Sequence, residues 1–535
     1  MSNSERRVYL FDTTLRDGAQ TQGVDFTAND KQTIAKALDQ LGLDYVEGGW
    51  PGANPTDDAF FSSPPQFSHS KFVAFGMTRR PGRSAANDPG VAPLLKAQVD
   101  ANCFVGKSWD FHVEKALGIS LSENIDMVRD TMAAAVAAGK EAMFDAEHFF
   151  DGFQSNPSFA TDCLKAALEG GARWVVLCDT NGGTLPIRVR EIVGQVLKEI
   201  PGEKLGVHFH NDTDNAVANS LVAVEMGARQ IQGTLNGLGE RCGNANLVSL
   251  IGSLKLKTDF EIGVSDKGLT KLTSISRLLD EILNRHPQRN SPYVGDSAFA
   301  HKGGLHASAV SKDPTTYEHV SPELVGNKRH VLVSDQAGKS NILSELKSLG
   351  IEIAPNDRKV SLLLDRVKEL DQQGISFDGA EASFEIFARS VLGRVPQYYK
   401  LERFRVIDEV RWNSKGEQVV EAIAMVALEV GGEEHMEAAK GNGPVNALDE
   451  ALRKALERFY PQLKDMELLD FKVRILDSSR GTQAVTRVVI ESKDQQGRNW
   501  STVGVSTNII DASYKALNEA ITWKLLKEGV KPASS

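Results

Sequence analysis

Short apolar runs alternate with longer amphipathic stretches along the N-terminal half of the chain. Apolar runs of this length between turn residues are typical of strands buried on both faces, and the stretches between them have the spacing of helices. The predicted strands are Val8–Leu15, Tyr45–Trp50, Lys71–Gly76, Ala101–Val105, Glu141–Glu147, Trp174–Cys178, Lys204–Asp212 and Gln230–Leu235. Eight strand–helix units over about 250 residues predict a (β/α)8 TIM barrel, and so the α/β fold class.

Helix signals between these runs support the same fold. Thr27 is the predicted N-cap of a helix over Thr27–Leu41, with Asp30 three residues further on. Pro186 stands near the start of a helix over Pro186–Ile200, a position that favours proline. A doubly wound sheet is the alternative fold, but no G-x-G-x-x-G motif follows the first strand.

Beyond the barrel the pattern changes twice. Residues 271–395 contain charged amphipathic stretches such as Ser361–Leu370, which predict helical linker subdomains. Residues 396–535 contain two similar halves, each predicted as two strands and a helix, and the two helices begin at Val445 and near Ile510 with related sequences. This internal duplication suggests an α+β regulatory or dimerising domain, and a purely structural tail fits the pattern equally well.

The expected organisation is therefore a TIM-barrel catalytic domain at 1–270, linker subdomains at 271–395 and a regulatory domain at 396–535. The net charge of −10 argues against a general nucleic-acid-binding protein, which needs a basic face. No apolar run approaches the length of a membrane span, and the polar N-terminus does not resemble a signal peptide. Four scattered cysteines without a C-x-x-C motif favour a reducing compartment, so we expect a cytoplasmic protein.

Polar residues follow the predicted barrel strands, at the end where TIM barrels carry their active sites. Asp17 follows the first strand, Glu147 the fifth, Asp179-Thr180 the sixth and Asn244 the eighth. The seventh strand ends in His208-Phe209-His210. Carboxylates, imidazoles and amides are thus expected at one rim.

His208 and His210 are predicted to form half of a divalent-metal site, because side chains two residues apart on a strand project to the same face. The first, seventh and eighth strands are contiguous in a closed barrel, so Asp17 and Asn244 can converge on the two histidines. A pair of hydrogen-bonded histidines is the alternative. Mixed nitrogen and oxygen ligation suits Zn²⁺, Mn²⁺ or Mg²⁺, and the sequence does not choose among them.

Other residues at the predicted rim could contact a substrate. Arg16 offers a guanidinium for a carboxylate or a developing oxyanion, or it forms a structural salt bridge with Glu47. Thr180 could donate its hydroxyl to the same carboxylate, or it only forms a turn. Glu147 could position a ligand or accept a proton.

Further candidates lie beside and beyond the barrel. His306 follows two glycines in a loop that could bring an acid or base over the site, and Tyr317 could relay a proton. Arg79, Arg80 and Lys107 could meet phosphates, but solvated surface charges are the preferred interpretation. No G-x-S-x-G motif is present, which disfavours a serine hydrolase.

Three motifs together resemble those of a known family. They are Asp12-Thr-Thr-Leu-Arg-Asp-Gly-Ala-Gln20, the run from His208-Phe-His-Asn-Asp to Ala-Val-Ala-Asn-Ser-Leu221, and Asn236-Gly-Leu-Gly-Glu-Arg-Cys-Gly-Asn244. The chain resembles the 2-isopropylmalate/homocitrate/citramalate synthase family, which is similar to the HMG-CoA lyase superfamily of metal-dependent barrels. The duplicated C-terminus is similar to the family's regulatory domain, so the resemblance covers nearly the whole chain.

Two segments, Glu47-Gly-Gly-Trp-Pro-Gly-Ala-Asn-Pro-Thr-Asp57 and Phe104-Val-Gly-Lys-Ser-Trp-Asp-Phe-His112, resemble the branch of the family that uses pyruvate. This implies an acyltransferase that catalyses a Claisen-type condensation of pyruvate with acetyl-CoA and water to (R)-citramalate and CoA, in isoleucine biosynthesis. The alternative within the family is the 2-isopropylmalate synthase reaction, which uses 2-oxoisovalerate. A non-catalytic amino-acid sensor and a lyase are rivals from other classes.

The resemblance also implies roles for individual residues. It makes Asp17, His208, His210 and Asn244 the metal ligands, Arg16 and Thr180 keto-acid contacts, Glu147 a catalytic glutamate, and His306 and Tyr317 a catalytic pair from beyond the barrel. The sequence leaves open whether Glu147 or His306 removes the methyl proton. His301-Lys-Gly-Gly-Leu-His306 departs from the family's usual His-x-Ser-Gly-Ile-His. A homodimer is expected, with no nucleic acid or membrane. Isoleucine is the favoured amino-acid effector, and leucine or no effector are the alternatives.

Overall fold

The computed structural model describes residues 6–285, 287–301, 303–331, 338–377, 379–412, 414–476 and 483–533. The chain divides into two compact units. The first comprises Met1–Phe299 and Val320–Arg329, and the second comprises Ala300–His319 and His330–Ser535. In the described part, no helix is both long enough and apolar enough to cross a membrane.

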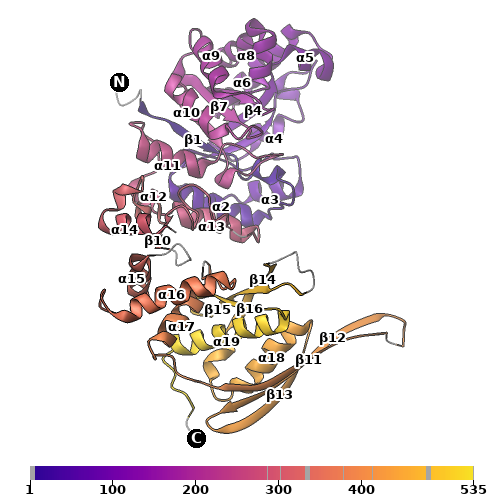
Figure 1. Cartoon of the computed structure of the whole chain (residues 1–535). Coiled ribbons are helices and arrows are strands. Elements are labelled where there is room, and N and C mark those ends of the chain that lie inside the picture. Colours follow the sequence, from indigo (N-terminus) through magenta and orange to yellow (C-terminus); the bar gives the residue numbers. More distant parts are fainter. Residues whose placement is uncertain are drawn as a thin grey trace. The chain divides into compact units, whose positions relative to one another are not determined.

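Eight parallel strands close into a barrel in the first unit, in the order of the sequence (Figure 1). They are β1 (Tyr9–Asp12), β2 (Tyr45–Glu47), β3 (Lys71–Met77), β4 (Ala101–Lys107), β5 (Glu141–Glu147), β6 (Trp174–Asp179), β7 (Leu205–Phe209) and β8 (Gln230–Gly233). Pairing of β1 with both β2 and β8 closes the sheet. The predicted TIM barrel is therefore confirmed, and the doubly wound alternative is wrong.

Helices surround this barrel on its outer side. They are α2 (Ala28–Leu41), α3 (Pro55–Ser62), α4 (Ala92–Lys96), α5 (Asp110–His112), α6 (Leu121–Ala137), α7 (Phe149–Ser155), α8 (Pro157–Glu169), α9 (Pro186–Val196), α10 (Ala216–Met226), α11 (Leu247–Lys257), α12 (Asp266–Leu269) and α13 (Leu272–Ile282). Thr27 caps α2 as predicted: its hydroxyl accepts from Asp30 N, and the Asp30 carboxylate accepts from Thr27 N.

The barrel interior is apolar at its N-terminal end. Phe11, Tyr45, Val73, Cys103 and Trp174 belong to one buried cluster inside the strands. Trp174 Nε1 donates to the Tyr45 hydroxyl at 3.1 Å, so even the polar atoms of this layer are paired. Packing at this end leaves the opposite, C-terminal end of the strands for polar side chains, as in other TIM barrels.

The second unit begins with a short strand pair and helices. They are β9 (Ala300–His301), β10 (His330–Val331), α14 (Gly304–Lys312), α15 (Lys339–Ser348), α16 (Arg358–Gln372) and α17 (Glu381–Val391). Buried side chains of α15, α16 and α17 share one small core that includes Leu346, Leu363 and Phe384. The amphipathic pattern over Ser361–Leu370 thus lies on a helix, as expected, while the division into three domains stays a prediction.

Two antiparallel three-stranded sheets follow, each with one long helix. The first has β11 (Lys400–Trp412), β12 (Gln418–Val430), β13 (Glu433–Gly441) and α18 (Pro444–Leu456); the second has β14 (Glu467–Ile475), β15 (Thr486–Lys493), β16 (Asn499–Ser506) and α19 (Ile509–Lys527). The duplication is confirmed, but the prediction of two strands per half was wrong. The first strand of each half, β11 and β14, is largely exposed and rich in charged residues, so it lacks the apolar run of a buried strand.

Candidate active site

His208 and His210 meet the segment that follows β8. The backbone of this segment returns to β7, since Ala245 N donates to Phe209 O at 3.0 Å and His210 forms an isolated β-bridge with Asn244. Asn244 Nδ2 therefore lies 3.1 Å from His208 Nε2. The ring centroids of the two histidines are 5.3 Å apart.

Asp17 reaches the same place from the loop after β1. Its Oδ2 lies 3.4 Å from His208 Nε2 and accepts from Asn244 Nδ2 at 3.2 Å. The four residues predicted as metal ligands are all buried, with exposed fractions of 2 to 7%. Barrel closure thus gathers side chains that are up to 227 residues apart in the sequence.

The donor chemistry of this group fits a divalent cation. It offers one carboxylate, two imidazoles and one amide, the mixed set that suits Zn²⁺, Mn²⁺ or Mg²⁺. Among the described residues, Asn244 Oδ1 is buried without a hydrogen-bond partner, and turning this amide over would bring the oxygen to the side of Asp17 and His208. In the described ranges of the chain, no group of three or more His, Cys, Asp or Glu side chains is arranged closely enough to hold a metal ion. A bound ion would therefore draw these donors closer.

The charges at this site favour the metal-binding protonation states. Burial alone would raise the pKa of Asp17, but Arg16 and the two histidines more than offset burial and lower this pKa. Burial and the neighbouring His208 lower the pKa of His210 to about 3. At neutral pH, Asp17 is thus a carboxylate and His210 a neutral imidazole, the forms that bind cations.

Arg16 is held rigidly next to Asp17. Its Nε donates to Glu47 Oε2 at 2.7 Å, and its Nη1 forms an ion pair with Asp17. The guanidinium lies 3.8 Å from the centroid of the Phe75 ring. The salt bridge to Glu47, the structural alternative for this residue, is therefore present. It also fixes the guanidinium at the rim, where a substrate contact stays a prediction.

Glu147 and Thr180 lie on the other side of the rim. Glu147 is paired in register with Lys107 of β4, and the Lys107 ammonium forms an ion pair with Glu147 Oε2. The Thr180 hydroxyl accepts a hydrogen bond from the backbone N–H of His148 at 2.9 Å. Thr180 thus supports the turn after β5, and its own hydroxyl proton is still available for a ligand.

Three family models match successive parts of the chain. The HMGL-like model matches residues 7–279, the homocitrate synthase post-HMGL domain-like model residues 293–374, and the LeuA allosteric (dimerisation) domain model residues 378–525. The chain belongs to the HMGL-like family.

Curated relatives of this HMGL-like chain are similar over nearly its whole length. The (R)-citramalate synthase of Aquifex aeolicus is 50% identical, with 98% of each chain covered. That of Geobacter sulfurreducens is 49% identical, covering 97% of this chain and 98% of the relative. The 2-isopropylmalate synthase of Methanocaldococcus jannaschii is 32% identical, over 98% of this chain and 96% of the relative. A solved Bacillus subtilis HMG-CoA lyase has 22% identity and a TM-score of 0.47, over 53% of this chain and 97% of that one.

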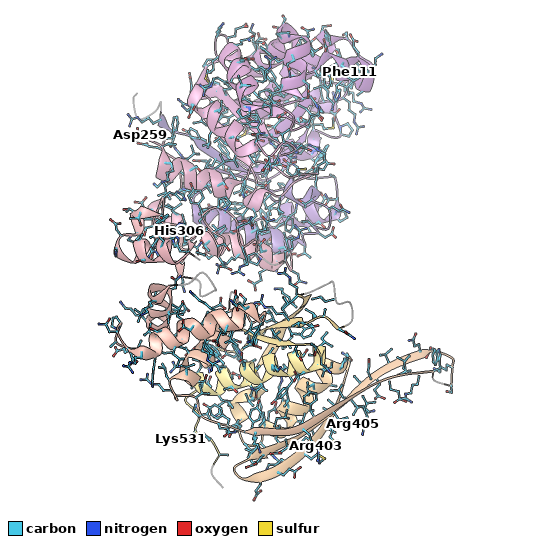
Figure 2. The ribbon with its side chains drawn as sticks, viewed as in Figure 1. Phe111, Asp259, His306, Arg403, Arg405 and Lys531 are labelled. Carbon is cyan, nitrogen blue, oxygen red and sulfur yellow. The ribbon has the colours of Figure 1, made fainter. Side chains whose placement is uncertain are left out.

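His306 and Tyr317 lie together in the second unit. His306 is exposed on α14, and its ring centroid is 4.2 Å from that of Tyr317 (Figure 2). His301, the other histidine of the same loop, lies 3.1 Å from Glu318 Oε1 through its Nε2. The structure thus brings the predicted pair together, while their approach to the metal donors of the barrel stays a prediction.

Arg79, Arg80 and Lys107 were considered as phosphate contacts. Two of them form ion pairs within the barrel, and the third lines a small pocket. Arg79 is buried and forms ion pairs with Glu123 and Asp130. Lys107 is engaged by Glu147. Arg80 lines a pocket of about 170 Å³ between the ends of β3 and β4, together with Trp50 and Lys107. Arg79 is therefore a buried structural residue, so the preferred interpretation as a solvated surface charge was wrong for it.

Several residues of the HMGL-like barrel were missed in the sequence. Gln232 on β8 contacts His208, and a signal existed because Gln230 and Gln232 are polar at alternate positions of an apolar strand. His148 follows Glu147 directly, and its ring meets that of His112 edge to face, with ring centroids 4.4 Å apart. The local sequence pattern does not predict the contact between His112 and His148, because this contact depends on the turns after β4 and β5.

Proposed function

We propose that this chain is an (R)-citramalate synthase, which condenses pyruvate with acetyl-CoA and water to form (R)-citramalate and CoA. The observation that carries the proposal is the full-length similarity to five curated (R)-citramalate synthases at 42 to 50% identity. Two other relatives, a 2-isopropylmalate synthase and a probable one, are 32 and 33% identical. The reaction would start isoleucine synthesis from pyruvate.

Asp17, His208, His210 and Asn244 would hold one divalent ion, Mn²⁺, Mg²⁺ or Zn²⁺. When bound, such an ion acts as a Lewis acid toward the keto group of pyruvate. The burial of these four side chains and their mixed donor atoms support the assignment.

Arg16 and Thr180 would bind the keto acid. The Arg16 guanidinium is fixed by Glu47 and Asp17, so it can stabilise negative charge on the former keto oxygen without reorganising. The Thr180 hydroxyl would donate to the carboxylate of pyruvate. The Arg16 interaction strengthens as the keto oxygen gains charge, which is how a preorganised donor lowers a barrier, whereas Thr180 orients the substrate.

Glu147 or His306 would act as the base. The base takes a proton from the acetyl methyl group, the resulting carbon attacks C2 of pyruvate, and the electrons of the C=O bond move to the oxygen, which is protonated. Water then cleaves the thioester and releases CoA as a free thiol. Tyr317, beside His306, would relay protons.

One assay tests the proposal. Free CoA thiol is measured with acetyl-CoA and pyruvate, 2-oxobutyrate, 2-oxoisovalerate or 2-oxoglutarate, with and without EDTA. We expect most thiol with pyruvate, and its loss with EDTA. Preference for 2-oxoisovalerate would instead indicate a 2-isopropylmalate synthase. Absence of thiol with every acceptor would favour a sensor, and cleavage of citramalate without synthesis would favour a lyase.

The regulatory part of the proposal concerns residues 396–535. Isoleucine would bind there, and the domain would join two chains into a homodimer. The name of the matching family, LeuA allosteric (dimerisation) domain, supports an allosteric effector and a dimer, and isoleucine is proposed because it is the end product of the proposed pathway. A pocket of about 740 Å³ between α18 and β14 offers charged groups of both signs, including Asp449, Arg453 and Lys464, beside apolar Leu468 and Phe471. Such a lining suits an apolar amino acid, and calorimetry with isoleucine and leucine would compare the two effectors.

A further inference from the structure

Gln232 lies directly opposite His208 inside the barrel. The two residues are paired in register on β8 and β7, so their side chains project to the same side of the sheet. Gln232 is fully buried and His208 is 5% exposed. Water therefore does not compete for the polar atoms of this pair, and their hydrogen bonds must be satisfied within the barrel.

The Gln232 amide connects His208 to Asp145. Its Oε1 lies 2.7 Å from His208 Nδ1, and its Nε2 donates to Asp145 Oδ1 at 2.9 Å. An amide nitrogen only donates and an amide oxygen only accepts. Because the Asp145 oxygen accepts from the nitrogen, the amide presents its oxygen to the imidazole. His208 Nδ1 must then carry the hydrogen.

The other imidazole nitrogen faces the metal donors. His208 Nε2 lies 3.4 Å from Asp17 Oδ2 and 3.1 Å from Asn244 Nδ2. A neutral imidazole carries one hydrogen, so a hydrogen on Nδ1 leaves a lone pair on Nε2, the atom that would bind a cation. Without Gln232, the Asp17 carboxylate would attract the hydrogen to Nε2, where it would block coordination.

We propose that Gln232 is a positioning residue that holds His208 in the Nδ1–H tautomer and so keeps Nε2 free for a divalent ion. Asp145 anchors the amide from its far side. The statement about the ion rests on the metal role proposed for His208, whereas the statement about the tautomer does not. Hydrogen-bond partners of this kind typically change metal affinity by about 10- to 100-fold.

The test uses the full chain with ¹⁵N-labelled histidine, freed of metal. The ¹⁵N shifts of His208, assigned with H208N, report which nitrogen carries the hydrogen. We expect Nδ1–H in the wild type, and a shift of the hydrogen to Nε2 in Gln232→Met, which has a similar volume but no amide. Gln232→Glu keeps an acceptor oxygen for Nδ1 and would share one proton with the neighbouring Asp145 carboxylate, so it should keep the wild-type tautomer.

Gln230→Met is the matched control. Gln230 is also fully buried and lies two residues away on the same strand and face, where its Nε2 contacts Met143 Sδ at 3.7 Å. This variant should keep both the tautomer and the metal affinity, measured by competition with a chromogenic chelator. Gln232→Met should bind the ion about 10- to 100-fold more weakly.

The outcomes separate the alternatives. An unchanged tautomer in Gln232→Met would overturn the proposal, even with weaker metal binding, because a merely structural role predicts that result. If Gln232→Met does not fold, Gln232→Glu decides, since loss of the Nδ1–H tautomer there would contradict the stated role. An enzyme that makes no citramalate yet passes the tautomer test would refute the proposed function alone.

Discussion

Lys107 and Glu147 lie directly opposite one another on β4 and β5, and the ammonium of the first forms an ion pair with Oε2 of the second. Both side chains are mostly buried, with exposed fractions of 17 and 24%. An ion pair in this setting is screened less by solvent than a surface pair. Lys107 therefore limits where the Glu147 carboxylate can point, which matters for a base that must reach a methyl proton.

Removal of the Glu147 carboxylate should slow the reaction strongly. General-base catalysis typically contributes about 10²- to 10⁴-fold, so Glu147→Gln should lower the rate of thiol release by about that factor if this residue is the base. Lys107→Met should lower the rate less, and Lys107→Arg should recover part of it, because the cation then remains. Deuterium uptake by the acetyl methyl group in D₂O measures the proton-transfer step. If His306→Asn abolishes this uptake and Glu147→Gln does not, the base is His306.

Metal removal and ligand substitution should weaken the same site. EDTA treatment should abolish thiol release, and added Mn²⁺, Mg²⁺ or Zn²⁺ should restore it, because Arg16 alone would not replace the Lewis acid at the keto oxygen. His210→Ala should lower metal retention, read by elemental analysis after dialysis. His112→Ala is the control, since His112 instead stacks on Trp109 and meets His148 edge to face. Full metal retention in His210→Ala would exclude this histidine as a ligand.

The barrel could be predicted because its strands carry a strong local signal. Strands such as Glu141–Glu147 are buried on both faces and read as short apolar runs, and the structure places this strand at the same residues. The gathering of Asp17, His208 and Asn244 followed from barrel closure alone, since contiguous strands bring their ends together. The distal strands Lys400–Trp412 and Glu467–Ile475 were missed, because they are largely exposed and their many charged residues leave no continuous apolar run.

Hydrogen-bond partners could not be predicted in the same way. The pairing of Lys107 with Glu147 depends on the register between β4 and β5, which varies with loop length. The contact between Gln232 and His208 depends on which face of β8 points inward. A shift of one residue in either strand would reverse the face, and the sequence pattern alone does not fix the register that closely.

Glu519 should make stability depend on pH in the weakly acidic range. Burial raises the pKa of this carboxyl on α19 to about 7, and the hydrogen bond from the Ser383 hydroxyl offsets only part of the effect. The folded pKa exceeds the ordinary value of 4.5, so the folded protein holds the proton more tightly than the unfolded chain. The stability that the bound proton of Glu519 adds to the folded protein is therefore fully present below pH 4.5 and is lost as the pH rises to about 7.

Glu519→Gln, which stays neutral, should remove this dependence. Above pH 7 the variant should be more stable than the wild type by about 1 to 2 kcal/mol, a figure discounted for the part of the carboxyl that water reaches. Below pH 4 the two proteins should have equal melting temperatures in scanning calorimetry. Glu450→Gln, at an exposed position on α18, is the control and should have no pH-dependent effect. A stability gain that is the same at every pH would contradict the assignment.

The outer face of the first C-terminal sheet should carry the homodimer contact. α18 packs on one face of β12 and β13, where Ala424 and Val426 are fully buried. The opposite face is left exposed: Ile407 is 44% and Met436 50% exposed, and Arg403 and Arg405 project from the same strand as Ile407 (Figure 2). Apolar side chains on a strand face without a covering layer are typical of an interface.

Ile407→Glu should therefore separate the two chains. Ile407 lies midway along the edge strand β11 and is paired with Ile423 of the central strand β12, so the introduced carboxylate would have to be desolvated if this face is covered in a dimer. Light scattering after size-exclusion chromatography should give twice the chain mass for the wild type and a single chain mass for the variant. Ile187→Glu, a substitution of an equally apolar residue that is 66% exposed on α9 of the barrel, should leave the mass unchanged. Dimers of Ile407→Glu with wild-type stability would place the contact elsewhere on the molecule.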